Sequence, residues 1–352
     1  MSPHGPDPGH KTELRLVFWE TTSACNLRCV HCRACATEDR PPDELSFEHG
    51  CRLLGDIASF AKPVIVLSGG EPLVREDILD IAAFGTDLGL RMVLATNGTM
   101  LSSDVARRLN DSGIQRISVS IDGAHASTHD LFRGLDGAFD AAMNGMEAAR
   151  EAGLPVQINT TVSRHNLDEL PRILDLAIKR GACALHLFLL VPTGCGKEIA
   201  DREMITPEEY ECVLNWLYDA SLTAPIELKA TCAPHHARVM RQRRAIPNSQ
   251  FPVPNSGRGC LAGSAVCFVS HRGEVYPCGY LPVSAGNVLD TPLHDIWRDS
   301  PLFAELRDPS LLKGKCCVCE FKQVCGGCRA RAYAETGDYL AEEPYCAYAP
   351  GA

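Results

Sequence analysis

Three cysteines near the N-terminus constrain this chain more than any other feature. They are Cys25, Cys29 and Cys32, separated by three residues and then by two. They follow an apolar run at 14–19 that predicts a first β-strand. An iron–sulfur cubane is completed by four thiolates, so a loop that offers three leaves one iron open to a small ligand. An alternative stays open, because Cys29, Cys32 and Cys35 also fit a ferredoxin-like run that closes the cluster for electron transfer.

Composition places the chain among ordinary globular proteins. Its 352 residues are 45% hydrophobic and 22% charged, which suits one large domain and a smaller one. A formal charge of −10 argues against general nucleic-acid binding, which needs a basic face. No stretch approaches the roughly 18 apolar residues of a membrane span, and the N-terminus lacks the core of a signal peptide. We expect a cytoplasmic protein with no membrane partner and a flexible tail at 1–13.

The chain contains 18 cysteines, most of them in groups. Without an export signal, grouped cysteines indicate metal ligands rather than disulfides. Cysteines outside the groups are expected to be buried as small hydrophobes. These are Cys51, Cys183, Cys195, Cys212 and Cys232.

Residues 14–230 alternate between apolar runs and amphipathic stretches. Strands are predicted at 14–19, 64–67, 91–96, 116–121, 156–162 and 184–190, and helices at 46–61, 75–89, 101–112, 136–152, 167–181 and from 206 onward. This alternation predicts an α/β fold, a partial (β/α)6 TIM-like barrel with parallel strands. Such folds place their active sites at the carboxyl ends of the strands. The alternation stops near residue 231, so 231–352 is expected to form a second domain that is rich in cysteine.

The second predicted strand ends in Gly69, Gly70 and Glu71. Two glycines at a strand end let a ligand approach the backbone closely. Free backbone groups and the carboxylate of Glu71 could then bind a polar group. Taken alone, the same sequence is an ordinary turn.

The cysteine loop and the Gly-Gly-Glu-Pro turn, on this scaffold, resemble the radical S-adenosylmethionine (SAM) superfamily. The resemblance implies a [4Fe–4S] cluster on Cys25, Cys29 and Cys32 whose open iron binds SAM, and it disfavours the ferredoxin alternative. It implies that Gly69, Gly70 and Glu71 hold the methionine amino group, and that a reduced cluster releases a 5′-deoxyadenosyl radical. It also assigns Ser120 and Asp122 to the SAM ribose and carboxylate, Arg133 to the carboxylate, and Asn159 and Val191 to the ribose and adenine.

The C-terminal cysteines surround a predicted hairpin at 266–276. They are Cys260, Cys267, Cys278, Cys316, Cys319, Cys325, Cys328 and Cys346. They resemble the SPASM extension of radical SAM enzymes, which implies auxiliary clusters. One cluster would use Cys260, Cys267, Cys278 and Cys328, and the second would use Cys316, Cys319, Cys325 and Cys346. The interval after Cys325 is one residue short of that pattern, so one or two clusters stay open. Zinc ribbons are the alternative.

A basic stretch at 227–244 adds a hint of the substrate. It contains His235 and the arginines Arg238, Arg241 and Arg244. Arginine suits carboxylates and imidazole suits haem iron. With the turn at 191–197, this stretch resembles the haem-biosynthetic branch of the superfamily. The resemblance implies that Fe-coproporphyrin III is the substrate, its propionates held by the arginines and its iron by His235.

The implied reaction converts two propionates into vinyl groups and yields haem b. Hydrogen leaves the propionate β-carbon, and carbon dioxide and one electron follow, with an auxiliary cluster as an electron acceptor. A ferredoxin or flavodoxin would supply low-potential electrons. Only 24 residues precede Cys25, too few for the leader-binding domain common in peptide-modifying relatives. The alternatives are a SPASM-type peptide maturase, a related haem d1 enzyme, and an iron–sulfur electron carrier without SAM chemistry.

Overall fold

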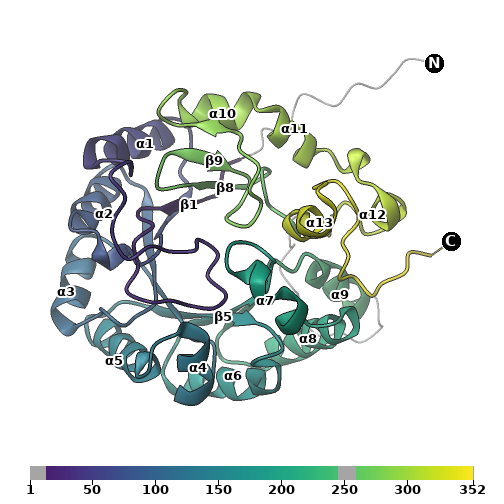
Figure 1. The fold of residues 1–352 in the computed structure, drawn as a ribbon, viewed down its shortest axis with the longest axis horizontal. Coiled ribbons are helices and arrows are strands. Elements are labelled where there is room, and N and C mark those ends of the chain that lie inside the picture. The colour runs from purple at the N-terminus through teal and green to yellow at the C-terminus, as the bar shows by residue number, and fades with distance from the viewer. Residues whose placement is uncertain (1–12, 245–258, 352) are drawn as a thin grey trace.

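The computed structural model describes residues 13–244 and 259–351. Its centre is one sheet in the order β10-β9-β8-β1-β2-β3-β4-β5-β6-β7, and helices form a ring around most of it (Figure 1). The strands are β1 Leu16–Glu20, β2 Val64–Ser68, β3 Arg91–Thr96, β4 Ile117–Ser120, β5 Val156–Val162, β6 Ala184–Leu189, β7 Glu227–Thr231, β8 Val266–Val269, β9 Glu274–Tyr276 and β10 Gly286–Asn287. Strands β1 to β7 are parallel, which confirms the predicted α/β barrel. The predicted tail at 1–13 lies almost entirely outside the described residues.

The barrel helices are α1 Phe47–Phe60, α2 Ile78–Asp87, α3 Ser103–Asp111, α4 Ala126–Arg133, α5 Ala138–Glu151, α6 Leu170–Lys179, α7 Gly196–Glu203, α8 Pro207–Ser221 and α9 His235–Arg244. Helices α10 Leu293–Asp299, α11 Pro301–Arg307, α12 Gly314–Val318 and α13 Arg329–Thr336 follow, and short 3-10 turns lie at Pro72–Val74, Leu167–Glu169 and Pro309–Leu311. Ser46 and Thr206 cap α1 and α8 through capping boxes, as expected. None of the helices in the described part of the chain is long and apolar enough to span a membrane.

The sheet has one parallel barrel strand more than predicted. Strand β7 pairs with β6 along Glu227–Thr231, where charged and apolar residues alternate and no side chain is fully buried. Edge strands of this kind lack the continuous apolar run by which the other strands are recognised. Helices α4 and α7 were also missed, and both lie in loops that follow strands.

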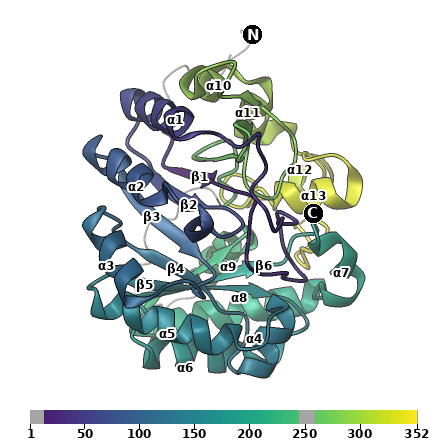
Figure 2. The same ribbon diagram turned by 60° about the vertical axis from the view of Figure 1, so that its left-hand side comes forward.

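The C-terminal region takes part in the same sheet. Strand β8 pairs in parallel with β1, Val17 opposite Cys267, and β9 returns antiparallel to β8 as the predicted hairpin. The sheet therefore crosses the predicted boundary between 230 and 231, and the division into domains stays a prediction. Figure 2 shows α10 to α13 gathered beside the barrel rather than apart from it.

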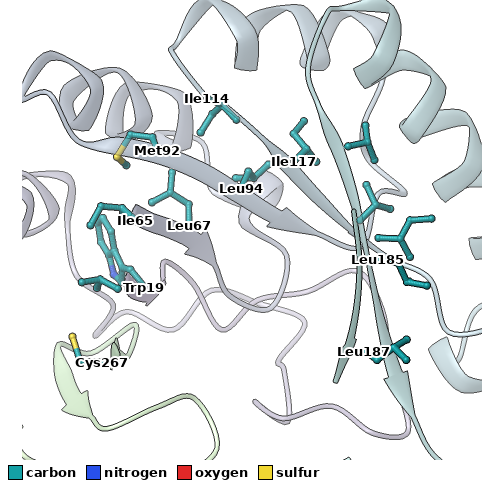
Figure 3. Close-up of a cluster of buried hydrophobic side chains, with 14 of the residues drawn as sticks. Trp19, Ile65, Leu67, Met92, Leu94, Ile114, Ile117, Leu185, Leu187 and Cys267 are labelled. Atoms are coloured by element: carbon teal, nitrogen blue, oxygen red, sulfur yellow. The ribbon is translucent and has the colours of Figure 1, made fainter. Parts of the chain in front are cut away.

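Both faces of the central strands are buried, as expected for a parallel sheet under helices. Figure 3 shows Trp19, Ile65, Leu67 and Leu94 in one cluster of buried side chains. All four are fully buried. This packing fixes the carboxyl ends of the strands, where the candidate site lies.

Candidate active site and thiol clusters

The loop after β1 presents the first three cysteines together. A parallel bridge between Ala24 and Thr37 closes the loop, with the amide of Cys25 donating to the Thr37 carbonyl at 2.8 Å. Burial, with smaller contributions from negative charge on Glu71, Cys29 and Cys32, raises the pKa of Cys25 to about 11. This mutual effect places the three thiols within electrostatic range of one another. They fit the ligand set that an iron–sulfur cluster requires.

Hydrogen-bond donors surround these sulfurs. The amide of Leu27 lies 3.4 Å from Cys25 Sγ, and Arg133 Nη1 lies 3.8 Å from Cys29 Sγ. Donors of this kind stabilise bound thiolates and tune the potential of a cluster. The loop is also held from outside, since the amide of Cys195 donates to the carbonyl of Cys32 at 2.9 Å.

Cys35 is engaged elsewhere. Its sulfur lies 2.9 Å from Cys195 Sγ, and its backbone is left-handed with φ of 47°. The set that the structure brings together is therefore Cys25, Cys29 and Cys32, without the fourth cysteine of a ferredoxin-like run.

The Gly-Gly-Glu turn packs directly against the cluster loop. The amide of Gly70 donates to Thr22 and that of Glu71 to Ala24, both at 2.8 Å. A β-carbon at Gly69 would lie 2.5 Å from the Thr22 carbonyl oxygen. Close approach of two backbones, rather than an unusual dihedral angle, is thus what the glycines allow.

The carboxylate of Glu71 is fully buried and is used within the protein. It accepts hydrogen bonds from Thr96 Oγ1 at 2.8 Å and from the amide of Asn97 at 2.7 Å. Burial raises its pKa to about 7 despite these bonds. Asn97 in turn directs its Nδ2 toward Cys25 Sγ at 3.9 Å. Sequence reasoning did not single out Asn97 as a site residue, although its position directly after β3 could have indicated it. Contact of Gly69, Gly70 and Glu71 with the methionine amine stays a prediction.

Asp122 and Arg133 form a buried ion pair beside Cys29. Arg133 Nη2 lies 2.6 Å from Asp122 Oδ2, and His31 Nε2 lies 3.3 Å from the same oxygen. Burial alone would raise the pKa of Asp122, but Arg133, helped by His31, His129 and the amide of Thr161, outweighs it and holds that pKa below its usual value. Burial lowers the pKa of His31 to about 4, so this ring is neutral, and it stacks on Phe132. Sequence reasoning missed His31.

The remaining predicted SAM contacts lie at the ends of neighbouring strands. Ser120 closes β4 and pairs in register with Asn159 of β5, and Val191 follows β6. Asn159 Oδ1 accepts a hydrogen bond from Gln157 at 2.7 Å. The structure brings these residues to the expected end of the sheet, and their ribose and adenine roles stay predictions.

One auxiliary set gathers as predicted. Cys316, Cys319, Cys325 and Cys346 line a single cavity in the C-terminal region. His235 and Arg238 line the same cavity.

The other auxiliary set requires a correction. Cys267 lies inside β8, is fully buried opposite Val17, and is drawn in Figure 3 among core side chains. Of the charged or ionisable groups in the described residues, only Arg307 influences its pKa, so it does not lie with Cys260, Cys278 and Cys328. A thiol that points into the core of a sheet cannot reach a site beyond the strand ends. Burial is the main reason why the pKa of Cys232 is raised, and charges on Cys328, Cys278 and Cys260 raise it as well. Cys232 is therefore near those three cysteines.

Of the predicted substrate residues, His235 and Arg238 require a correction, whereas the roles of Arg241 and Arg244 stay predictions. His235 is 1% exposed and sits 3.7 Å from Glu343, away from the loop of Cys25. Arg238 is buried and forms an ion pair with Glu211 of α8. Arg241 is exposed on α9. Arg244 is the last residue of that helix, and its side chain is not among those that the structure describes. Arg238 of α9 thus takes part in packing against α8, and its charge is neutralised there by Glu211.

A zinc site and an iron–sulfur cluster differ in how closely their thiolate ligands lie. No three His, Cys, Asp or Glu side chains within 13–244 and 259–351 are grouped tightly enough for a single metal ion. A zinc ion binds sulfur at about 2.3 Å and draws its ligands close together. A four-iron cubane is larger and accepts more widely spaced thiolates.

Comparison with known proteins agrees with this geometry. Residues 19–177 match the Radical SAM superfamily, and 260–329 match SPASM, an iron–sulfur cluster-binding domain. An AdoMet-dependent heme synthase of Methanosarcina barkeri is 52% identical over 342 residues, covering 96% of this chain and 97% of that protein. One from Nitratidesulfovibrio vulgaris is 46% identical, covering 99% and 96%.

A solved structure supports the fold alone. Streptococcus suis SuiB bound to S-adenosylmethionine aligns with a TM-score of 0.74 at 17% identity, covering 96% of this chain and 78% of that one. The two domain matches indicate [4Fe–4S] clusters and SAM as the cofactors, and the assignment of the clusters to these thiol sets stays a prediction.

Proposed function

Because the chain belongs to the radical SAM superfamily, in the family of the AdoMet-dependent heme synthases, we propose that it makes haem b from Fe-coproporphyrin III by oxidative decarboxylation of two propionates. Identity of 52% along almost the whole of both chains is the observation that carries this proposal. The three converging thiols of Cys25, Cys29 and Cys32 support it, because radical chemistry needs an iron with an open position.

SAM and the reduced cluster together supply a 5′-deoxyadenosyl radical that takes one hydrogen atom from the substrate. Cys25, Cys29 and Cys32 hold that cluster. The protein's part is to orient the reactants and exclude competing reactions. The buried ion pair of Asp122 and Arg133 lies beside Cys29 and gives that side of the site fixed charges. Glu71 accepts a hydrogen bond from the amide of Asn97 and so keeps Asn97 beside Cys25.

Each vinyl group requires that a propionate lose one hydrogen atom, one carbon dioxide and one electron. Clusters on the C-terminal cysteines offer a place for that electron, since iron–sulfur clusters accept single electrons. A low-potential ferredoxin or flavodoxin is the donor that we expect for the first cluster.

Anaerobic assay of the reconstituted protein with Fe-coproporphyrin III, SAM and dithionite tests the proposal. We expect monovinyl and divinyl porphyrins by mass spectrometry, together with 5′-deoxyadenosine. Cys29→Ser should abolish both products, whereas Cys51→Ser, outside every thiol set, should retain them. Formation of 5′-deoxyadenosine without vinyl product would refute the porphyrin substrate and favour a maturase. Absence of both from the loaded protein would favour an electron carrier.

A further inference from the structure

Cys232 has an unusual backbone for a residue expected to fill the core. Within the described chain, only Cys35 and Cys232 are non-glycine residues with positive φ, and Cys232 has a φ of 56°. Residues other than glycine rarely adopt this backbone conformation, and it persists only where the surrounding structure imposes it. Here the carbonyl of Cys232 accepts hydrogen bonds from Tyr210 Oη at 3.2 Å and from the guanidinium of Arg331. Two buried side chains thus hold the residue in place.

Arg331 ties this position to the C-terminal region. It lies on α13, is fully buried, and forms an ion pair with Glu343 at 3.1 Å. Glu343 in turn accepts from the amide of Cys328 at 2.6 Å. The clamp on Cys232 and the support of Cys328 are therefore parts of one buried network.

The chain before Cys260 passes against the same turn. A β-carbon at Gly259 would lie 2.8 Å from the carbonyl oxygen of Pro234 and 3.1 Å from that of Cys325. The amide of Cys260 donates to the Cys325 carbonyl at 3.2 Å. Cys260 is thereby fixed between the segment that follows Cys232 and the segment that precedes Cys328.

From this arrangement we propose that Cys232 is the fourth ligand, with Cys260, Cys278 and Cys328, of an auxiliary iron–sulfur cluster. Cys232 lies outside 260–329, the residues that match the SPASM domain. Beside this geometry, burial and then the charges of Cys328, Cys278 and Cys260 raise the pKa of Cys232, and burial raises the pKa of Cys278 to about 12. One buried and three partly buried thiols gain little from this arrangement without a metal, whereas metal binding deprotonates them and adds folding energy.

The cluster would close the barrel. Cys232 follows β7 at one edge of the sheet, and Cys278 follows β9 near the opposite edge. A cluster on both joins edges that no strand pairing connects among the described residues. The site also adjoins the first thiol loop, because Arg33 Nη1 donates to the Gly279 carbonyl at 3.4 Å. The proposed cluster is therefore close enough to the loop of Cys32 to accept an electron from the active site.

Cys232→Ala and Cys267→Ala make a matched pair for the test. Both remove one inward-facing thiol from the same region, but only the first removes a proposed ligand. In the full chain, reconstituted anaerobically, we expect Cys232→Ala to lose about four iron and four sulfide ions relative to Cys267→Ala. The reduced protein should lose the corresponding part of its integrated paramagnetic resonance signal. Equal iron, sulfide and spin in the two variants would overturn the proposal, as would zinc in place of iron.

Alkylation of the wild-type chain decides the matter if Cys232→Ala does not fold. Peptide mapping should find Cys232, Cys260, Cys278 and Cys328 protected in the loaded protein and reactive after chelation, with Cys267 protected in both states. Equal reactivity of Cys232 before and after chelation would overturn the proposal. None of these readouts depends on the porphyrin reaction, so failure of the decarboxylation assay and failure of this inference are distinguishable.

Discussion

Gly70→Ala should disable the first thiol loop while leaving the barrel folded. Gly70 lies where the end of β2 meets the segment Ser23–Ala24, just before Cys25. An added β-carbon would lie 2.6 Å from the carbonyl carbon of Ala24 and 2.7 Å from the carbonyl oxygen of Ser23. Both neighbours are backbone atoms, so no side-chain rotation relieves the overlap.

The size of the effect follows from these distances. Ordinary contact begins at 3.4 Å, so the carbonyl carbon 2.6 Å away must retreat by about 0.8 Å. The carbonyl oxygen of Ala24 lies closer still, so about 0.8 Å is a lower bound, and Cys25 moves with this segment. Overpacking of this kind costs about 1–3 kcal/mol of stability. A misplacement near 1 Å at a reacting centre costs about 100-fold in rate. We therefore expect a small fall in melting temperature and about a 100-fold fall in 5′-deoxyadenosine formation.

Gly55→Ala is the matched control. Gly55 lies inside α1, and nothing is within 4 Å of its added β-carbon. Alanine there should stabilise the helix by about 1 kcal/mol and leave SAM cleavage unchanged. Circular dichroism melting and anaerobic SAM cleavage, with iron content measured on the same samples, give both quantities. Wild-type cleavage by Gly70→Ala at full cluster content would refute the packing argument.

Three further predictions concern buried charges. Arg133→Met leaves the Asp122 carboxylate buried without its partner and should lower the free energy of unfolding by about 3–5 kcal/mol at pH 7.5. Adding Asp122→Asn should restore most of it in denaturant titrations, and additive losses would contradict the pairing. Burial lowers the pKa of His236 to about 4, so the unfolded chain binds this proton first and stability falls as pH drops from about 6.5 toward 4. His236→Asn should reduce that slope by up to about 1.4 kcal/mol per pH unit, and an unchanged slope of unfolding free energy would count against the argument. Arg238→Met should lower the melting temperature, because Glu211 loses its partner, yet leave the Soret shift on titration with Fe-coproporphyrin III unchanged. A weaker Soret response at an unchanged melting temperature would return Arg238 to substrate binding.

Regular local patterns explain which parts of the fold could be predicted. The strands predicted at 91–96 and 156–162 coincide with β3 and β5, because a nearly continuous apolar run marks β3 and frequent β-branched residues mark β5. Strand β7 escaped because its side chains are half exposed, and helix α4 because it is one short amphipathic stretch between a strand and a turn. Its residue Arg133 was nevertheless singled out, through resemblance rather than periodicity.

The thiol sets show why spacing in the sequence identifies some ligands and not others. Cys25, Cys29 and Cys32 share one loop, so their spacing predicts the set without the fold. The set around Cys260 draws on segments far apart, and Cys267 was assigned to it by its position in the SPASM-like cysteine pattern. Its place inside β8 excludes it, since a strand buried on both faces points its side chains into the core.

Position relative to the strand ends is a more general criterion for cluster ligands than spacing in the sequence. Cys232 and Cys278 both lie just past a strand, and Cys328 caps the start of α13, so all three can face the space that the edges of the sheet enclose. The left-handed backbone of Cys232 comes from the clamp by Arg331, which lies about a hundred residues further along the chain. No local pattern encodes such a contact. The ligand that joins the barrel to its C-terminal region therefore emerges only once the chain is folded.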